Sequence, residues 1–388
     1  INYNSNQYKK YNLKMETDFQ PKMYFTEYGQ LKDSNLKDSK IIKEPIKIEF
    51  SIQNPTNGSY SIQAKIYEDH IDEVYAKHKE SIDLKRPYAT KEIQKVINCA
   101  NKNLGCSVYE CPNCGDFIFV GHTCKSRACS SCGYKYKNAR VVSILNTAYN
   151  CKHRQIVFTM DKILWPYFYF PYERMINILF KAVRDTIYSI FNETYKYDRK
   201  NKKLKKYISK IKRTPGFFAF LHTFGRDLKW NPHIHVLIAE LELCSDGKVR
   251  KHEYFNYEAL RKRFQKILLD LMEKEIGPSF KKIKAECYKN DQNGFYVYAE
   301  KKEFTSFKAG VEYVTRYCGR APISENRIIN YDGENVTFCY NDHNDESYHE
   351  ITITAEQFIL LLINHMVPTE FKIIRYYGFY RKKHKLHN

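Results

Sequence analysis

The sequence predicts an α+β protein with a cysteine-rich unit ahead of its main strand-forming region. Segments 216–224 and 233–241 are apolar and aromatic and are separated by a polar stretch, which is typical of an antiparallel strand pair. Segments 167–195 and 258–276 instead carry apolar residues at helical spacing. Seven of the twelve cysteines lie within positions 99–132, ahead of all these segments. Such clustering predicts a small unit stabilised by metal.

Length and charge limit the classes of function. The chain has 388 residues, enough for two or three domains. Its 64 Lys and Arg against 44 Asp and Glu give a formal charge of +20, which favours a polyanionic partner. The longest apolar run, 358–363, is too short to span a bilayer, and residues 1–10 lack the apolar core of a secretory signal. We therefore expect a cytoplasmic protein without a membrane partner, whose cysteines are thiols or metal ligands.

The N-terminal part divides into an extension and a helical unit. Residues 1–65 are polar without a sustained period and predict an irregular or partly strand-like extension. Residues 66–103 have helical periodicity interrupted by a proline, so two helices are expected before the cysteine cluster. A third helix is expected over 134–148. These patterns predict an N-terminal domain over 66–148 and a second domain over 149–388.

The second domain should begin with the short β-rich segment 154–160, which is followed by the helices and strand pair above. Residues 285–300 predict another strand pair with a turn at 291–294, and residues 306–317 return to helical spacing. The remaining expected elements are short strands at 327–330, 335–340 and 347–354 and a last helix over 355–365.

The cysteine spacing predicts a structural zinc site. Cys111-x2-Cys114 and Cys129-x2-Cys132 are separated by a loop that can bring two tight turns together, so that four thiolates surround one ion. The alternative is a chance group of core thiols. Three further cysteines and a histidine could form a second site: Cys99, Cys106, Cys124 and His122. Two nearby cations, Lys125 and Arg127, suit a module that lies on phosphates.

Two histidines two residues apart form a candidate metal site in the second domain. His233 and His235 lie at i and i+2 on a predicted strand, so both side chains should point to one face. His222 on the preceding strand could complete a set of three ligands with open positions for phosphate oxygens. The alternative is a pair of histidines satisfied within the core.

Two tyrosines are candidate nucleophiles. Tyr313 and Tyr317 are at i and i+4 and therefore share a helix face, with Arg316 and Arg320 nearby. Tyrosine can act as a covalent nucleophile, although an i,i+4 pair in a tyrosine-rich chain can also serve packing alone. A histidine pair, a tyrosine pair, a zinc module and a basic charge are much less likely to occur together by chance than any one of them alone.

At this point the sequence resembles the IS91-type transposases, members of the HUH endonucleases that include rolling-circle replication initiators and plasmid relaxases. The resemblance covers about residues 65–385. It rests on these motifs, in order: Cys99 with Leu104-Gly105, Cys111-Pro-Asn-Cys114-Gly115, Cys124-Lys-Ser-Arg-Ala-Cys129-Ser-Ser-Cys132, Val157-Phe158-Thr159, His222-Thr223-Phe224-Gly225, Pro232-His233-Ile234-His235, Tyr313-x3-Tyr317, Arg320-x-Pro322-Ile323-Ser324, His365-Met-Val-Pro368 and Ile374-Arg375-Tyr376-Tyr377-Gly378.

The sequence departs from the family pattern in two places. The N-terminal extension is longer than the family's, and Asn231 stands where the family usually has a third histidine. We therefore expect His222 to be the third metal ligand, with Gln155 and Asn231 as alternatives.

The resemblance implies a fold and its metals. It implies a central antiparallel sheet flanked by helices, with His233 and His235 on a central strand and the tyrosines on a facing helix. It also implies that residues 66–148 are a zinc-binding domain that binds DNA and that 149–388 form the catalytic domain. The histidines would hold Mg²⁺ or Mn²⁺, and no small-molecule cofactor is expected.

The resemblance further implies an activity. The protein would nick and rejoin single-stranded DNA at the ends of a mobile element and at a target site, through a 5′-phosphotyrosine formed by Tyr313 or Tyr317. Arg316 and Arg320 would grip flanking phosphates, and the protein would be associated with the nucleoid. The rival interpretations are a plasmid replication initiator or relaxase, and a non-catalytic zinc protein that binds nucleic acid.

Overall fold

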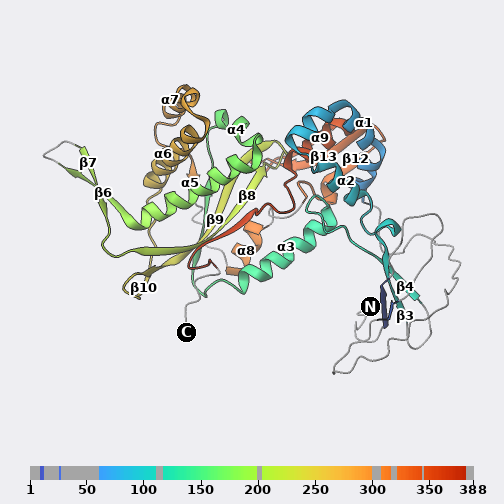
Figure 1. Cartoon of the computed structure of the whole chain (residues 1–388), viewed down its shortest axis with the longest axis horizontal. Coiled ribbons are helices and arrows are strands. Elements are labelled where there is room, and N and C mark those ends of the chain that lie inside the picture. The colour runs from blue at the N-terminus through green and yellow to red at the C-terminus, as the bar shows by residue number, and fades with distance from the viewer. Residues whose placement is uncertain are drawn as a thin grey trace.

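The computed structural model describes residues 9–12, 26–27, 61–110, 117–198, 203–298, 307–315, 321–342 and 345–381. Helices and antiparallel strands both contribute to the fold, which confirms the α+β prediction. The described chain forms two hydrophobic cores, one around a long central sheet and one around the N-terminal helices. Figure 1 shows the helices and strands that form these two cores side by side.

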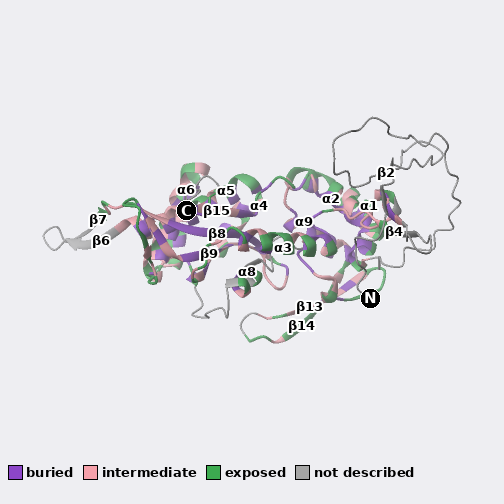
Figure 2. Ribbon diagram, turned by 90° about the horizontal axis from the view of Figure 1, so that it is seen from below, coloured by how far each residue is buried: buried purple, intermediate pink, exposed green. Residues whose placement is uncertain are grey.

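The central sheet carries the histidine motif. All of its strand pairs are antiparallel. In spatial order its strands are β11 (Val297–Tyr298), β5 (His153–Phe158), β9 (Trp230–Cys244), β8 (Arg213–Phe224) and β15 (Ile374–Gly378), and β10 (Val249–Lys251) pairs with the far end of β9. Strands β8 and β9 are buried along most of their length (Figure 2), which explains their nearly continuous apolar sequences.

The edge strand β15 approaches β8 closely because of a glycine. Gly378 pairs with Gly216 and has a φ of 61°, a conformation that side chains with a Cβ rarely adopt. A Cβ built on Gly378 would lie 1.5 Å from the carbonyl oxygen of Pro215. The last strand can therefore dock against β8 only with glycine at this position.

Helices cover both faces of the central sheet. On one face lie α5 (Tyr172–Asn192) and α6 (Tyr257–Ile276), where Phe264 of α6 packs edge-on against Phe158 of β5 with ring centroids 5.1 Å apart. On the other face lie α3 (Ser130–Leu145) and α8 (Phe307–Thr315), as Figure 1 shows. The short helix α4 (Trp165–Tyr169) precedes α5.

One predicted strand pair is replaced by a helix. Residues 281–290 form α7 (Lys281–Asn290), and only Val297–Tyr298 of the expected pair over 285–300 is a strand, β11. The prediction of two strands there was wrong. The buried Cys287 sits in the main core, and its carbonyl oxygen accepts a hydrogen bond from the Gln265 amide of α6, so tertiary packing favours a helix.

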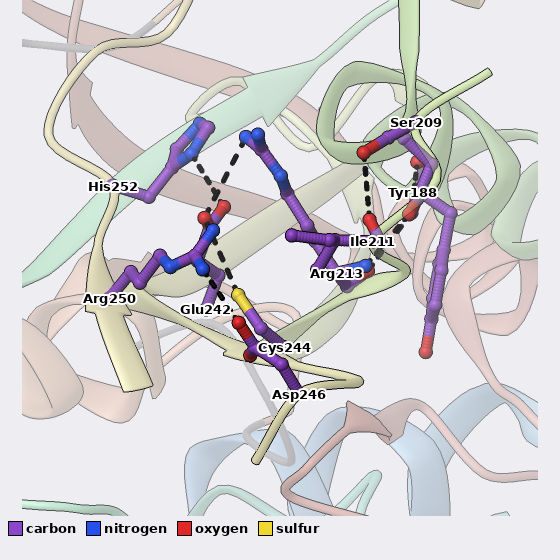
Figure 3. A network of polar contacts seen from close by, with 10 residues as sticks. Tyr188, Ser209, Ile211, Arg213, Glu242, Cys244, Asp246, Arg250 and His252 are labelled. Carbon is purple, nitrogen blue, oxygen red and sulfur yellow. Dashed lines mark hydrogen bonds and ion pairs between the residues drawn. The ribbon is translucent and has the colours of Figure 1, made fainter. Parts of the chain in front are cut away.

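A two-stranded hairpin of β6 (Glu193–Asp198) and β7 (Lys203–Ile208) projects from the end of α5 (Figure 1). A buried polar network holds its base (Figure 3). The Glu242 carboxylate, 3% exposed, lies 3.1 Å from Nδ1 of His252 and 3.7 Å from Nη1 of Arg213. Arg213 in turn exchanges two backbone-to-amide hydrogen bonds with Asn192, the last residue of α5. The network therefore fixes the direction in which the hairpin leaves the body.

The second core joins segments from both ends of the chain. Its helices are α1 (Ile62–Lys85), α2 (Ala89–Ile97) and α9 (Ala355–His365), and its sheet is β12 (Ile328–Tyr331), β13 (Asn335–Asn341) and β14 (Tyr348–Thr354). Beside it, β3 (Cys106–Glu110) and β4 (Phe117–Gly121) form a sheet with β1 (Lys9–Asn12) and β2 (Thr26–Glu27). Residues 323–366, expected in the second domain, thus pack against α1 and α2, which were expected in the N-terminal domain.

The arginine at the end of α1 links the two cores. Arg86 is 1% exposed, and its guanidinium donates hydrogen bonds to the carbonyl oxygens of Tyr169 (3.2 Å) and Asn364 (3.0 Å). It also lies over the rings of Tyr169, Tyr172 and Trp230, at 4.7 to 5.8 Å from their centroids. Among the described residues no carboxylate forms an ion pair with it. Carbonyl dipoles and aromatic faces therefore stabilise this buried charge.

A buried histidine at the end of α9 supports the turn between β8 and β9. The Nε2–H of His365 donates to the carbonyl oxygen of Leu228 at 2.7 Å, and Nδ1 accepts from the Thr223 hydroxyl at 3.2 Å. Its ring stacks on Trp230. Burial lowers the pKa of His365 to about 4, so the neutral ring is the folded form.

We predict that His365 makes the fold sensitive to acid. Its pKa is lowered on folding, so the unfolded chain binds one more proton between about pH 6.5 and 4, and stability falls as the pH drops through this range. At pH 4.5 the loss from this residue should be about 2 to 3 kcal/mol relative to pH 7. Urea unfolding of the wild type and His365→Gln at both pH values measures it. An identical pH dependence of the two proteins would contradict the prediction.

Candidate functional site

Three histidines converge on one face of the central sheet. His222 of β8 lies directly opposite His233 of β9, and His235 follows two residues along the same strand. One ring nitrogen from each lies within 4.8 Å of those from the other two. The ring centroids are 4.0 to 5.2 Å apart. Neutral imidazoles in this arrangement can hold one divalent cation.

Neighbouring groups orient two of these rings. Nδ1–H of His233 donates to the backbone carbonyl oxygen of Asn231 at 2.7 Å, and the Gln155 side-chain amide of β5 lies 2.9 Å from Nδ1 of His235. Because Nδ1 of both rings contacts the protein, Nε2 would be the atom that binds a metal. His222, 3% exposed, occupies the third position of the cluster, whereas Gln155 contacts His235 and the Asn231 carbonyl oxygen contacts His233.

The helix expected to carry the nucleophile lies over this face. On β5 and β9 the side chains alternate between the two faces of the sheet. The face that packs against α5 and α6 carries the buried residues 156, 158, 234 and 236, whereas His233 and His235 alternate with them. The histidines therefore point to the opposite face, where α8 packs on β5 and β9 with Val311 fully buried. Tyr313 lies on α8. Tyr317, Arg316 and Arg320 lie outside the described residues.

Four cysteine thiols form a second cluster at the start of α3. The Sγ atom of Cys132 lies 3.6 Å from that of Cys99 and 3.5 Å from that of Cys124, and Cys129 lies 3.7 Å from Cys99. Four sulfurs bound to zinc at 2.3 Å in a tetrahedron are about 3.8 Å apart. Backbone N–H groups of residues 124, 126 and 132 point at the sulfurs, as is common around thiolate ligands. The set fits a structural zinc ion.

This thiol set differs from the one that the spacing predicted. Cys129 and Cys132 belong to it, but their partners are Cys99 and Cys124 rather than the expected pair, Cys111 and Cys114, which lie outside the described residues. The hydrogen bond from Cys124 is the largest contribution that lowers the pKa of the Cys99 thiol to about 7. The set spans the β3–β4 hairpin, which folds back and brings distant cysteines together; no local spacing reveals this.

The remaining expected members of the zinc-binding region have other surroundings. Cys106 is half-buried outside the thiol cluster, and burial raises the pKa of its thiol. His122 is held by the Leu104 carbonyl oxygen and the Ser107 hydroxyl. A second metal site is therefore not assembled from these residues in the described part of the chain.

The two cations expected to contact phosphates have different surroundings from each other. Lys125 is exposed beside the thiol cluster and is available to an anion. Arg127 instead donates to the carbonyl oxygens of Phe371 (3.1 Å) and Thr369 (3.0 Å), and also to that of Pro368. Its guanidinium connects the thiol cluster to the segment that leads into β15. This structural role was not visible from the sequence.

Comparison with known proteins decides the family. Residues 216–387 match the family described as "Putative transposase", and residues 66–160 match the family described as "Transposase zinc-binding domain". The chain belongs to the IS91-type transposases. In this transposase, region 216–387 contains the three clustered histidines and region 66–160 contains the four clustered thiols.

Two relatives agree with this assignment. The transposase is 28% identical over 310 residues to the transposase for insertion sequence element IS801 of Pseudomonas savastanoi pv. phaseolicola. The match covers 76% of this chain and 70% of that protein. It is 25% identical over 311 residues to the protein named "Putative transposase y4qJ" of Sinorhizobium fredii, covering 74% and 73% of the two chains. No solved structure matches the chain. In the described ranges no helix is long and apolar enough to cross a membrane.

We predict that Cys99→Ser abolishes zinc binding by the transposase. The substitution removes one of four clustered thiols, so the bound zinc should fall from about one ion per chain to well below half, and Tm should drop by several degrees. Metal content after dialysis and a thermal melt measure both effects. Cys106→Ser is the matched control and should leave both unchanged. Loss of zinc from Cys111→Ser but not from Cys99→Ser would instead support the arrangement predicted from spacing.

Proposed function

We propose that this transposase nicks and rejoins single-stranded DNA at the ends of its mobile element and at the target site, through a 5′-phosphotyrosine. Tyr313 or Tyr317 would be the nucleophile, and His222, His233 and His235 would hold Mg²⁺ or Mn²⁺. The observation that carries the proposal is the convergence of three imidazoles on the sheet face that α8 covers.

The proposed chemistry balances without an external energy source. The phenolic oxygen attacks phosphorus, the bond from phosphorus to the 3′ oxygen breaks, and that oxygen leaves as a 3′-OH after taking a proton. The phosphodiester is conserved as a phosphotyrosine, so a later 3′-OH can reverse the step and join strands. A divalent cation at the histidines, when bound, would neutralise charge on the scissile phosphate. A second tyrosine would allow a second cleavage while the first adduct persists.

The roles of the other parts follow from their chemistry. The formal charge of +20 suits a DNA substrate, and the exposed Lys125 beside the thiol cluster is placed to contact phosphates. Arg316 and Arg320, adjacent in sequence to the proposed nucleophiles, would bind flanking phosphates. The zinc-binding region would help to hold the element's ends.

Two rival functions are less well supported. A plasmid replication initiator or relaxase would share the tyrosine chemistry, but the family matches and both relatives carry the word transposase in their descriptions. A non-catalytic zinc protein that binds nucleic acid would not need the histidine cluster. Three imidazoles this close together suit a shared divalent cation, for which that function has no use.

We predict a covalent adduct between the transposase and DNA. Labelled single-stranded oligonucleotides that carry the element's ends, incubated with Mn²⁺ or Mg²⁺, should give a protein-linked band on a denaturing gel. The band should fall at least about 100-fold in His235→Ala and in Tyr313→Phe or Tyr317→Phe, and should persist in the control Tyr254→Phe. An adduct that needs neither tyrosine, or no adduct with any end, would contradict the proposed function.

We also predict that Gln155 positions His235 for metal. Because its amide contacts Nδ1 of that ring, Gln155→Leu should raise the Mn²⁺ concentration for half-maximal adduct formation about 10-fold or more. The maximal rate at saturating Mn²⁺ should change less. Gln155→Glu places a carboxylate oxygen that can accept from Nδ1–H when Nε2 of His235 binds the metal, and should restore most of the apparent affinity. Equal metal dependence in the wild type and Gln155→Leu would refute this role.

A further inference from the structure

Two exposed tyrosines lie at the outermost described strand of the central sheet, Tyr298 on β11 and Tyr296 immediately before it. Tyr296 and Tyr298 are 53% and 41% exposed, whereas the residues that alternate with them, Phe295 and Val297, are buried in the main core. The alternation places the two tyrosine side chains on the side of the chain opposite the buried Phe295 and Val297. Large exposed aromatic side chains on such a surface are typical of binding sites for planar ligands.

The two rings are already arranged as a stack. Their centroids are 5.8 Å apart and their planes are tilted by only 9°. The Arg261 guanidinium lies 5.2 Å from the Tyr296 ring centroid, and its Nε donates to the carbonyl oxygen of Val297. The Tyr296 ring is thus contacted both by the Tyr298 ring and by the Arg261 guanidinium of α6. The rings are therefore already ordered, so a ligand that stacks on them would lose less conformational entropy on binding.

The register of the sheet aligns this stack with the histidines. Tyr298 pairs with Val157, and Val157 pairs with His235, so the three residues form one row across β11, β5 and β9. Residues directly opposite each other in antiparallel strands share a face. With neighbouring strands about 4.8 Å apart, the backbone of Tyr298 lies roughly 10 Å from that of His235. A nucleic-acid strand whose phosphate lies at the histidines would bring its next bases over the tyrosines.

We propose that Tyr296 and Tyr298 stack with unpaired bases of the DNA strand beside the phosphate that is cut. The inference rests on the proposed function. Aromatic faces accept any base, and the Arg261 charge suits the adjoining backbone, so the platform would select single strands over duplex without strong sequence preference. Paired bases, stacked within a helix, could not offer their faces to these rings.

The test is binding in the absence of cleavage. Oligonucleotides that carry 2-aminopurine at successive positions around the nick site are bound to full-length protein in the His235→Ala background without metal. Stacking should quench fluorescence at one or two neighbouring positions. Tyr296→Ala and Tyr298→Ala should each remove the quench and weaken single-strand binding roughly 5- to 100-fold, whereas duplex binding changes little.

Matched variants separate stacking from a general loss of surface. Tyr296→Phe and Tyr298→Phe keep the rings and should behave like the parent, and Tyr254→Ala removes a tyrosine that is 77% exposed elsewhere and should have no effect. Far-ultraviolet circular dichroism checks that each variant is folded. Unchanged quench and affinity in both alanine variants, or an equal loss in Tyr254→Ala, would overturn the proposal. Intact stacking together with no adduct in the wild-type protein would reject the proposed function and leave the stacking proposal standing.

Discussion

The antiparallel register of β8 against β9 is the constraint on which the candidate site depends. Side chains alternate between the two faces of a strand, so a shift of one residue would send His222 to the face opposite His233. Several contacts fix the register: the helix-covered apolar face, the His365 contacts at the connecting turn, and the glycine that lets β15 dock on β8. The chemistry of the site is thus set by backbone pairing more than by any single side-chain contact.

The two cores meet close to this pair of strands. Leu228, in the turn between β8 and β9, is fully buried in the second core, while the strands on either side belong to the first. Arg86 and Arg127 reach across the junction and are held by backbone carbonyl oxygens. Such bonds depend on the position of the main chain, so they tie the zinc-binding region to the sheet in one relative orientation.

Patterns within one element were predictable from the sequence. Helical spacing over 258–276 and the apolar strands that hold His222, His233 and His235 are local features, and the structure contains α6, β8 and β9 there. The membership of the thiol cluster was harder to predict, because Cys99 and Cys124 reach it only through the fold of β3 and β4. The second core could not be predicted at all, because its halves are joined by packing between segments far apart in the chain. The helix at 281–290 was missed since its composition alone did not outweigh the expected turn.

The second core is built from segments near both ends of the chain, and this affects how the protein folds during its synthesis. Arg86, at the end of α1, bonds to a carbonyl oxygen 278 positions further along the chain, and α1 packs against α9. While the ribosome is still translating the sheet, the apolar sides of the first helices have no partner to cover them. A message that stops early, by nonsense mutation or frameshift, would yield a product with neither core complete. Such fragments would expose apolar surface that the complete chain buries, which makes them good substrates for proteolysis.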